Sequence, residues 1–387
     1  MPTLDLSFRN FVHDLCDRVL AGAEVAREEA IRLLSARGPD SFDLFAAANR
    51  VRDQFQGQDV HLCSIVNAKS GRCSEDCGFC AQSARFETGV PEYDLLDASS
   101  IRQHALAAKE RGAQALGIVT AWRGLKKGRS LDLILERLRE INTVPGLHAD
   151  ASLGIIDDPE IPALLKAAGL HTYNHNLESS RRFYPQVCST HDYDERLRTI
   201  RLMKDAGVRI CSGGIFNMGE EPEDRVDLAL ELRALDVDIV PMNFLNPMDG
   251  TPMGSRTLMP PMEALRTIAM FRFVLPRKEI MVAGGREVNL GQLQSLMFIA
   301  GASATMAGHY LTSTGRATAD DWDLIEALEM DFLPPGTVHP SRAADTRART
   351  WSPDVGLPGP EAPTLPSSPG SRRLAVFAGG QGGAAVE

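Results

Sequence analysis

The chain has 387 residues, 43% of them apolar, and its 51 acidic against 41 basic side chains give a formal charge of −10. This length and composition allow one large domain or two domains with a sizeable core. The acidic balance argues against binding to nucleic acid or to anionic membrane surfaces. No run of about 18 apolar residues predicts a membrane span.

Residues 1–58 are predicted to be helical, because apolar residues recur there at spacings of three and four. Examples of these apolar positions are Ala30, Leu33 and Leu34, then Phe42, Phe45 and Ala46. The first 20 residues include several charged side chains and lack the apolar region of a signal peptide. We therefore expect an N-terminal helical cap on the main domain, and a cytoplasmic, reducing location that suits free thiols.

From residue 59 to 333, short β-like runs alternate with longer amphipathic helical stretches. The expected strands are Leu62–Ala68, Ala115–Ala121, Leu147–Leu153, His171–Glu178, Val208–Ile215, Asp238–Leu245, Glu279–Gly284 and Ala304–Ala307. The expected helices between them are Ser100–Arg111, Ser130–Ile141, Pro159–Ala168, Tyr193–Ala206, Glu223–Leu235, Met262–Phe273 and Asn289–Ala300. Eight βα units with short connections predict a parallel (β/α)8 barrel of the TIM type. An open doubly wound sheet is the alternative, but no G-x-G-x-x-G follows the first strand.

Residues 334–387 differ in composition from the rest of the chain. They contain nine of its 23 prolines, together with Gly, Ser, Ala and scattered arginines. Such a segment has little with which to build a core. It is predicted to be a disordered tail.

Three cysteines, Cys73, Cys77 and Cys80, are spaced C-x3-C-x2-C, and the aromatic Phe79 precedes the third. Three thiolates on a tight loop can hold three irons of a [4Fe–4S] cluster and leave the fourth iron open to a substrate or cofactor. A zinc site would usually need a second C-x2-C pair, which this chain lacks. Zinc or unligated thiols remain the alternatives, while seven cysteines are too sparse and odd in number for a disulfide framework.

The cysteine loop follows the first strand, and the active site of a (β/α)8 barrel lies at the C-terminal ends of the strands. At the fourth strand, alternation places Asn174, Asn176 and Glu178 on one face. Polar side chains inside a barrel are costly unless they bind something, and amides suit a urea-like or ribose group. The opposite orientation, with Tyr173, His175 and Leu177 inside, stays open at this point.

Two glycine-containing segments also point to the barrel mouth. Gly213 and Gly214 follow Cys211 on the fifth strand, where they would let the backbone approach a cofactor or would form a bend. Arg286 follows two glycines at the seventh strand. It is expected to face the barrel mouth, beside an anion or a cluster, with a surface salt bridge as the alternative.

Taken together, these residues resemble the radical S-adenosylmethionine superfamily and, within it, the biotin synthase family. The cysteine motif with Phe79 is the superfamily pattern. The segments that resemble the family, in order, are Gly71–Phe86, Tyr173–Glu178, Cys211–Ile215 and Gly284–Glu287. The resemblance covers roughly residues 40–315.

The resemblance implies a [4Fe–4S] cluster on Cys73, Cys77 and Cys80 that binds S-adenosylmethionine at its open iron. An electron from a low-potential donor of the flavodoxin or ferredoxin type would then release a 5′-deoxyadenosyl radical. The implied substrate is dethiobiotin, into which sulfur from an auxiliary [2Fe–2S] or [4Fe–4S] cluster is inserted to form biotin. The resemblance also implies a homodimer.

Several site residues follow from the same resemblance. Asn174 and Asn176 match positions near substrate and cofactor, and Glu178 stands where the family has an aspartate that contacts the cofactor ribose. Gly213 and Gly214 match the cofactor-binding segment.

The auxiliary site departs from the family pattern. The three cysteines and one arginine that hold the family's auxiliary cluster fall at Gly117, Asp150, Cys211 and Arg286. Gly117 has no side chain with which to ligate, and a carboxylate such as Asp150 is a hard ligand at a soft site. Either the cluster is held differently, or the reaction is not sulfur insertion.

We favour the first explanation and expect a second three-thiolate site of Cys63, Cys188 and Cys211, with His191 as a spare ligand. The alternatives are another radical enzyme of the same barrel group, such as a hydrogenase-cofactor maturase or a methylornithine synthase, and a non-catalytic iron–sulfur carrier.

Overall fold

A computed structural model describes residues 6–308, 310–311 and 315–332 of the chain. The predicted tail at 334–387 lies outside the described residues. Within them, no helix combines the length and the apolar character that crossing a membrane requires.

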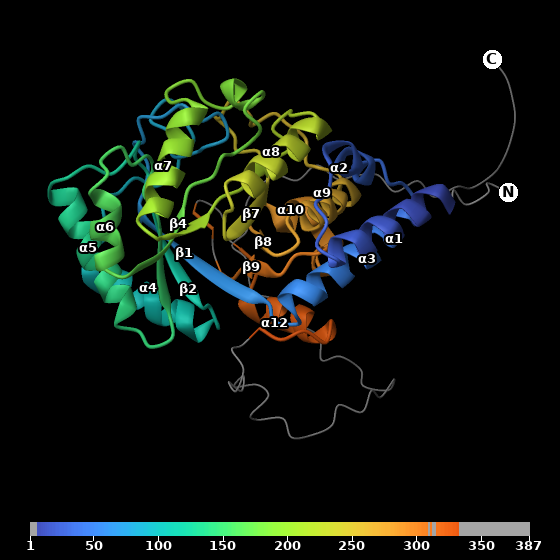
Figure 1. Ribbon diagram of the computed structural model, residues 1–387. Helices are drawn as coiled ribbons and strands as arrows, with labels where there is room; N and C mark the ends of the chain where they lie inside the picture. Colours follow the sequence, from blue (N-terminus) through green and yellow to red (C-terminus); the bar gives the residue numbers. More distant parts are fainter. Residues whose placement is uncertain (1–5, 309, 312–314, 333–387) are drawn as a thin grey trace, which may run out of the picture. The chain divides into compact units, whose positions relative to one another are not determined.

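A closed barrel of parallel strands forms the centre of the fold, as the sequence predicts (Figure 1). The strands are β1 (His61–Lys69), β2 (Ala115–Thr120), β3 (His148–Ser152), β4 (Leu170–Asn174), β5 (Arg209–Cys211), β6 (Gly214–Phe216), β7 (Ile239–Phe244), β8 (Glu279–Val282) and β9 (Ala304–Met306). They follow one another in the order β5-β4-β3-β2-β1-β9-β8-β7-β6, and a pairing of Cys211 with Ile239 closes the ring between β5 and β7.

Strands β5 and β6 together fill one position of the eight-membered barrel, because the chain breaks its regular pairing at residues 212 and 213. A Cβ atom at Gly213 would lie 2.0 Å from the carbonyl oxygen of Pro241 on the neighbouring β7. Only glycine allows that approach of two backbones. The break therefore follows from the sequence, and it places Gly213 and Gly214 beside the upper barrel.

The helices cover the outside of the barrel and alternate with the strands (Figure 1). They are α4 (Ala98–Glu110), α5 (Arg129–Asn142), α6 (Ile161–Ala167), α7 (Tyr193–Asp205), α8 (Pro222–Ala234) and α9 (Pro261–Val274). Helix α5 shows why they pack: Leu131, Ile134, Leu138 and Ile141 share one buried face at helical spacing. Asp97 and Asp192 cap α4 and α7 by accepting hydrogen bonds from backbone amides of the first turn.

The last crossover differs from the expected single helix at Asn289–Ala300. It consists of α10 (Arg286–Leu290), a 3-10 turn η2 (Gly291–Leu293) and α11 (Leu296–Ile299). Gly291 has a φ of 52°, a left-handed value that ends α10. Arg286 is the first residue of α10, three residues before the expected helix begins.

The N-terminal segment is helical, with α1 (Leu6–Leu20), α2 (Arg27–Leu34) and α3 (Pro39–Gln56). Helix α3 packs against α1 and α9, and α2 packs against α8 and α9. These helices therefore extend the outer layer on one side of the barrel. A further helix, α12 (Thr318–Ala327), follows the last strand and has no counterpart among the expected elements.

Candidate active site

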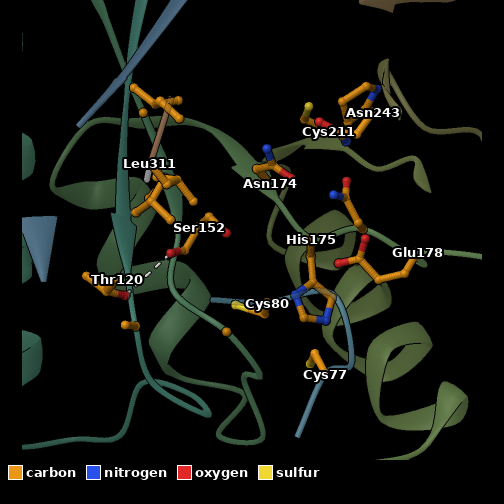
Figure 2. A pocket seen from close by; sticks show the side chains of 18 of the residues that line it. Cys77, Cys80, Thr120, Ser152, Asn174, His175, Glu178, Cys211, Asn243 and Leu311 are labelled. Carbon is orange, nitrogen blue, oxygen red and sulfur yellow. Dashed lines mark hydrogen bonds between the residues drawn. The ribbon is translucent and has the colours of Figure 1, made fainter. Parts of the chain in front are cut away.

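A cavity of about 350 Å³ runs from the loop after β1 down into the barrel (Figure 2). Along β1 and β7 the wall follows strand alternation, because every second residue lines it: Cys63 and Ile65 on β1, and Ile239, Pro241 and Asn243 on β7. The residues that matter for the chemistry are Cys63, Cys73, Cys77, Cys80, Gly117, Asp150, Asn174, His175, Asn176, Glu178, Cys211 and Asn243. Eight of the predicted site residues thus gather at one cavity, whereas Cys188, Gly213, Gly214 and Arg286 do not belong to its described lining.

The upper end of the cavity is formed by the cysteine loop. Its backbone is fixed near both ends, since Cys73 donates its amide to Gln82 at 3.0 Å and Gly78 donates to Val187 at 2.8 Å. Met253 in turn donates to the Gly78 carbonyl at 3.1 Å. All three motif thiols are partly exposed, and all three line the cavity. Three soft donors on one anchored loop fit a [4Fe–4S] cluster with one open iron.

The segment of residues 187–191 is hydrogen-bonded to this loop, and we call the contact between them the clasp. The carboxylate of Asp76 accepts hydrogen bonds from the amides of Ser189 at 2.9 Å and Thr190 at 3.1 Å. The hydrogen bonds from Ser189 and its neighbours lower the pKa of Asp76 far below its usual range, despite the opposing effect of burial. The loop is therefore held in place by a charged clasp.

Cys188 belongs to this clasp and not to the lower barrel. Its Sγ lies 3.2 Å from Asp76 Oδ1 and 3.3 Å from His191 Nδ1. The donor atoms of Cys77, Cys188 and His191 all lie within 4.8 Å of one another. The hydrogen bond with Cys77 lowers the pKa of the Cys188 thiol to about 4.

This placement corrects the expected triad. Cys63 and Cys211 pack together in a separate cluster of buried side chains that does not include Cys188. Figure 2 shows Cys211 at the other end of the cavity from Cys77 and Cys80. The physical reason is that residue 188 follows the fourth strand by a loop that rises to the barrel mouth, whereas Cys63 and Cys211 lie within strands.

A second network at the mouth was not expected from the sequence. One oxygen of the buried Glu75 carboxylate, Oε2, makes three polar contacts. It lies 2.5 Å from His191 Nδ1, 2.8 Å from Thr190 Oγ1 and 3.1 Å from Arg123 Nη1. Arg123 also pairs with Glu195. Arg123 follows β2 directly, so the rule that barrel sites lie after the strands was the one signal that could have found it.

The polar side chains after β4 line the middle of the cavity. Asn176 Oδ1 accepts the Gly213 amide at 3.2 Å, and Arg196 donates to the Asn176 carbonyl at 2.7 Å. Glu178 is buried, its Oε1 lies 3.5 Å from Arg196 Nη1, and its Oε2 has no partner among the described residues. Burial raises the pKa of Glu178, and Arg196 opposes that shift. An unpartnered buried carboxylate oxygen costs about 1–3 kcal/mol, which a ligand hydroxyl would offset.

His175, the residue directly after β4, also lines the cavity. Its Nε2 is buried without a partner among the described residues, and burial keeps its pKa well below the usual value. Strand alternation places it outside, but β4 ends at Asn174 and the following residues turn. Asn243 on β7 was likewise not expected; its Oδ1 accepts the Gly284 amide at 2.9 Å.

The lower end of the cavity holds Cys63 on β1 and Cys211 on β5. Both thiols are buried, and burial raises the pKa of each well above the usual value. Gly117 pairs in register with Asp150, whose Oδ1 has no hydrogen-bond partner among the described residues. Two thiols, an orphaned carboxylate oxygen and the space left by Gly117 fit a metal cluster, with a ligand set different from three cysteines and an arginine.

Arg286 is placed differently from the expectation. Its guanidinium is buried, donates to Asp321 Oδ2 at 2.6 Å, and lies 3.6 Å from Glu287 Oε1. Nε also donates to the Tyr310 hydroxyl at 3.4 Å. The side chain is therefore directed toward α12, because Asp321 supplies a buried negative charge there.

Comparison with known proteins gives two matching family models. The model described as "Radical SAM superfamily" matches residues 68–232, and the one described as "Biotin and Thiamin Synthesis associated domain" matches residues 241–331. Among curated proteins, the biotin synthase of Geobacter metallireducens is 50% identical over 316 residues, which cover 82% of this chain and 96% of the relative. That of Geobacter sulfurreducens is 49% identical over 319 residues, which cover 82% and 97%.

Solved structures share the fold at much lower identity. A methylornithine synthase matches with a TM-score of 0.73 and 19% identity, over 83% of this chain and 97% of that one. A maturase of the [FeFe]-hydrogenase matches with a TM-score of 0.70 and 15% identity, over 82% and 74%. At these identities the likeness concerns the barrel and not the reaction.

Proposed function

The chain belongs to the biotin synthase family, and we propose that Cys73, Cys77 and Cys80 hold the [4Fe–4S] cluster that the family's reaction requires. The observation that carries this assignment is the anchored loop whose three thiols line one cavity with the polar residues after β4. When bound, the cluster and S-adenosylmethionine supply an organic radical that removes hydrogen from dethiobiotin, and an auxiliary cluster supplies sulfur.

The residues after β4 bind and orient the cofactor. We assign the free Oε2 of Glu178 to the ribose hydroxyls, and the amides of Asn174 and Asn176 to cofactor and substrate. Asn176 is held by the Gly213 amide, and Arg196 keeps a positive charge beside Glu178. Gly213 and Gly214 allow close backbone contacts with Pro241 and Glu178, which fix this part of the barrel. The enclosed barrel excludes water from the reacting carbon.

Cys63 and Cys211 are assigned to the auxiliary cluster. They lie in the barrel interior, below the residues proposed to bind the cofactor, so a sulfur donor held there faces the substrate from below. Asp150 is a further candidate ligand on the described wall, since its charge acts on both thiols. Arg286 is bound to Asp321 and is not assigned as a ligand in this conformation.

The direct test is anaerobic turnover. Reconstituted protein, given S-adenosylmethionine, a low-potential reductant and dethiobiotin, should form 5′-deoxyadenosine and biotin. Formation of 5′-deoxyadenosine without biotin would leave a radical enzyme with another substrate. Failure to form either product, in protein that has lost no iron, would refute the assignment.

We further propose a small redox protein as electron donor, a homodimer as the assembly and the cytoplasm as the location. The family favours a flavodoxin or ferredoxin as donor and a homodimer as assembly. Seven unpaired cysteines suit the cytoplasm. Sedimentation of the loaded protein tests the dimer, and reduction by each purified donor tests the partner. A monomer at micromolar concentration would contradict the dimer.

A further inference from the structure

A second cavity, of about 210 Å³, opens at the opposite end of the barrel. We call it the floor pocket. It is lined by His61, Gln114, Ala115, His148, Asp150, His171, Thr172, Arg209 and Glu279. Five of these residues are the first residues of their strands, so the pocket lies at the N-terminal ends of the strands; they are His61, Ala115, His148, Arg209 and Glu279.

The floor pocket is formed by the layer of inward-facing side chains directly below Cys63 and Cys211. His61, Arg209 and Glu279 each precede an inward-facing residue of the main cavity by two positions; those residues are Cys63, Cys211 and Met281. Layers inside a (β/α)8 barrel are normally filled with branched apolar side chains. Here imidazoles, a guanidinium and carboxylates replace that packing, and several of these groups are open to solvent: the side chains of His171 and Arg209 are 35% and 42% exposed. The floor pocket therefore offers imidazole and carboxylate groups that an ion can reach from solvent.

The donors in the pocket come in pairs. His61 Nδ1 lies 2.6 Å from Glu279 Oε1, and His171 Nδ1 lies 3.7 Å from Asp150 Oδ1. The rings of His148 and His171 stack with their centroids 4.2 Å apart. Among the described residues, only Cys77, Cys188 and His191 place three donors within 4.8 Å of one another. The floor pocket therefore has imidazole and carboxylate donors without a tight preformed cage, which suits weak, exchangeable binding of a divalent ion.

Asp150 connects the two cavities. It lines both the floor pocket and the main cavity, and its side chain is only 12% exposed. Its Oδ1 has no hydrogen-bond partner among the described residues. The charge of Asp150 also acts on Cys63 and Cys211, since it contributes to the raised pKa of both thiols. One buried carboxylate thus lines the floor pocket on one side and the cavity of the two thiols on the other.

We propose that the floor pocket binds ferrous iron and passes it, by way of Asp150, to the auxiliary site at Cys63 and Cys211. This proposal rests on the proposed function, because it needs an auxiliary cluster at those two cysteines. Imidazole together with carboxylate is the ligand set of non-haem ferrous sites in proteins. The route reaches the auxiliary site from the end of the barrel that substrate and S-adenosylmethionine do not occupy.

The test uses full-length protein with its cysteine-loop cluster loaded and with no sulfide present. Anaerobic addition of ⁵⁷Fe²⁺ should give a high-spin ferrous Mössbauer signal with nitrogen and oxygen ligands. A variant with both His148→Ala and His171→Ala should bind this iron at least about tenfold more weakly. His104→Ala, an exposed histidine on α4, should bind it like wild type. After sulfide is added, the double variant should also rebuild the auxiliary cluster more slowly.

Cleavage of S-adenosylmethionine reports on the fold and on the cysteine-loop cluster in each variant. If the double variant cleaves it normally yet binds ⁵⁷Fe²⁺ as tightly as wild type, the floor pocket is not the iron site. A ferrous signal with only sulfur ligands in wild type would overturn the proposal in the same way. If the double variant fails to fold, two other measurements test whether the floor pocket is the iron site. They are ⁵⁷Fe²⁺ binding by Glu279→Gln and anomalous scattering from iron in wild-type crystals. Loss of cleavage in wild type itself would instead refute the proposed function.

Discussion

Arg286 donates from Nη2 to Asp321 Oδ2 across 2.6 Å, and the two side chains are 1% and 2% exposed. The pair joins the start of α10 to α12, the helix that follows the last strand. The guanidinium held in this way lies outside the described lining of the cavity that contains Cys63 and Cys211. The bond between these two residues therefore decides which side chains are left to hold an auxiliary cluster.

Asp321→Ala should destabilise the protein by about 3–5 kcal/mol, because it leaves the buried charge of Arg286 without its closest partner. Denaturant unfolding of the loaded protein measures the change. Asp320→Ala is the matched control, since Asp320 is exposed and pairs with Arg316 only at 3.5 Å; it should change stability by less than about 1 kcal/mol. Equal effects of the two substitutions would contradict the structural role of the buried pair.

Cys188→Ala should leave the iron of the auxiliary site in place, since Cys188 lies with Cys77 and His191 at the barrel mouth. It should instead shorten the lifetime of the cysteine-loop cluster in air, because the clasp on Asp76 loses one of its bonds. Cys16→Ala, a buried cysteine on α1, serves as control. Iron analysis and the decay of cluster absorbance decide the matter; loss of auxiliary iron in Cys188→Ala would restore the triad that the sequence predicts.

Glu178→Gln should raise the KM for S-adenosylmethionine about tenfold, because a charge-assisted hydrogen bond to a ribose hydroxyl contributes about 1.5–3 kcal/mol. The effect on the rate at saturating cofactor should be smaller. Steady-state formation of 5′-deoxyadenosine measures both constants. Glu223→Gln, at an exposed position on α8, should leave them unchanged. An unaltered KM in Glu178→Gln would remove this residue from the cofactor site.

Glu279→Gln should reduce stability in a pH-dependent way. Burial lowers the pKa of His61, but the hydrogen bond and charge of Glu279 raise it more, so the net pKa lies above 6.5. A raised pKa in the folded state adds stability that is fully present below the unfolded value and is lost as the pH rises through the folded value. The loss caused by Glu279→Gln should therefore be largest in acid and shrink above that pKa.

Urea unfolding at a series of pH values measures this profile in metal-free buffer. Glu87→Gln, at an exposed position, is the control and should show no such trend. A loss in Glu279→Gln that stays constant across the pH range would show that the pair with His61 does not titrate as described.

The fold could be predicted from the sequence because its local signals agree with one another. Each of the eight expected strands overlaps an observed strand, and the barrel follows from their regular alternation with helices. The positions at which strands are interrupted or end are harder to predict from the sequence. The interruption at Gly213 depends on contact with Pro241, and the end of β4 at Asn174 depends on pairing with β5; both are tertiary effects.

The site could be predicted only where residues act locally. The cysteine loop and the polar residues after β4 come from short motifs whose members share one turn or strand. Cys188 and Arg286 depend on partners far along the chain, Cys77 in one case and Asp321 in the other, and no spacing rule finds such pairs. The floor pocket cannot be predicted from sequence for the same reason, since its histidines come from β1, β3 and β4.

The central claim is that two separate groups of cysteines serve two clusters at the two ends of one cavity. The iron and acid-labile sulfide content of anaerobically reconstituted protein tests it most directly. Wild type should hold clearly more than the four irons of a single [4Fe–4S] cluster. The variant with both Cys63→Ala and Cys211→Ala should fall to about four irons, still cleaving S-adenosylmethionine but forming no biotin. An iron content that this double variant leaves unchanged would contradict the account.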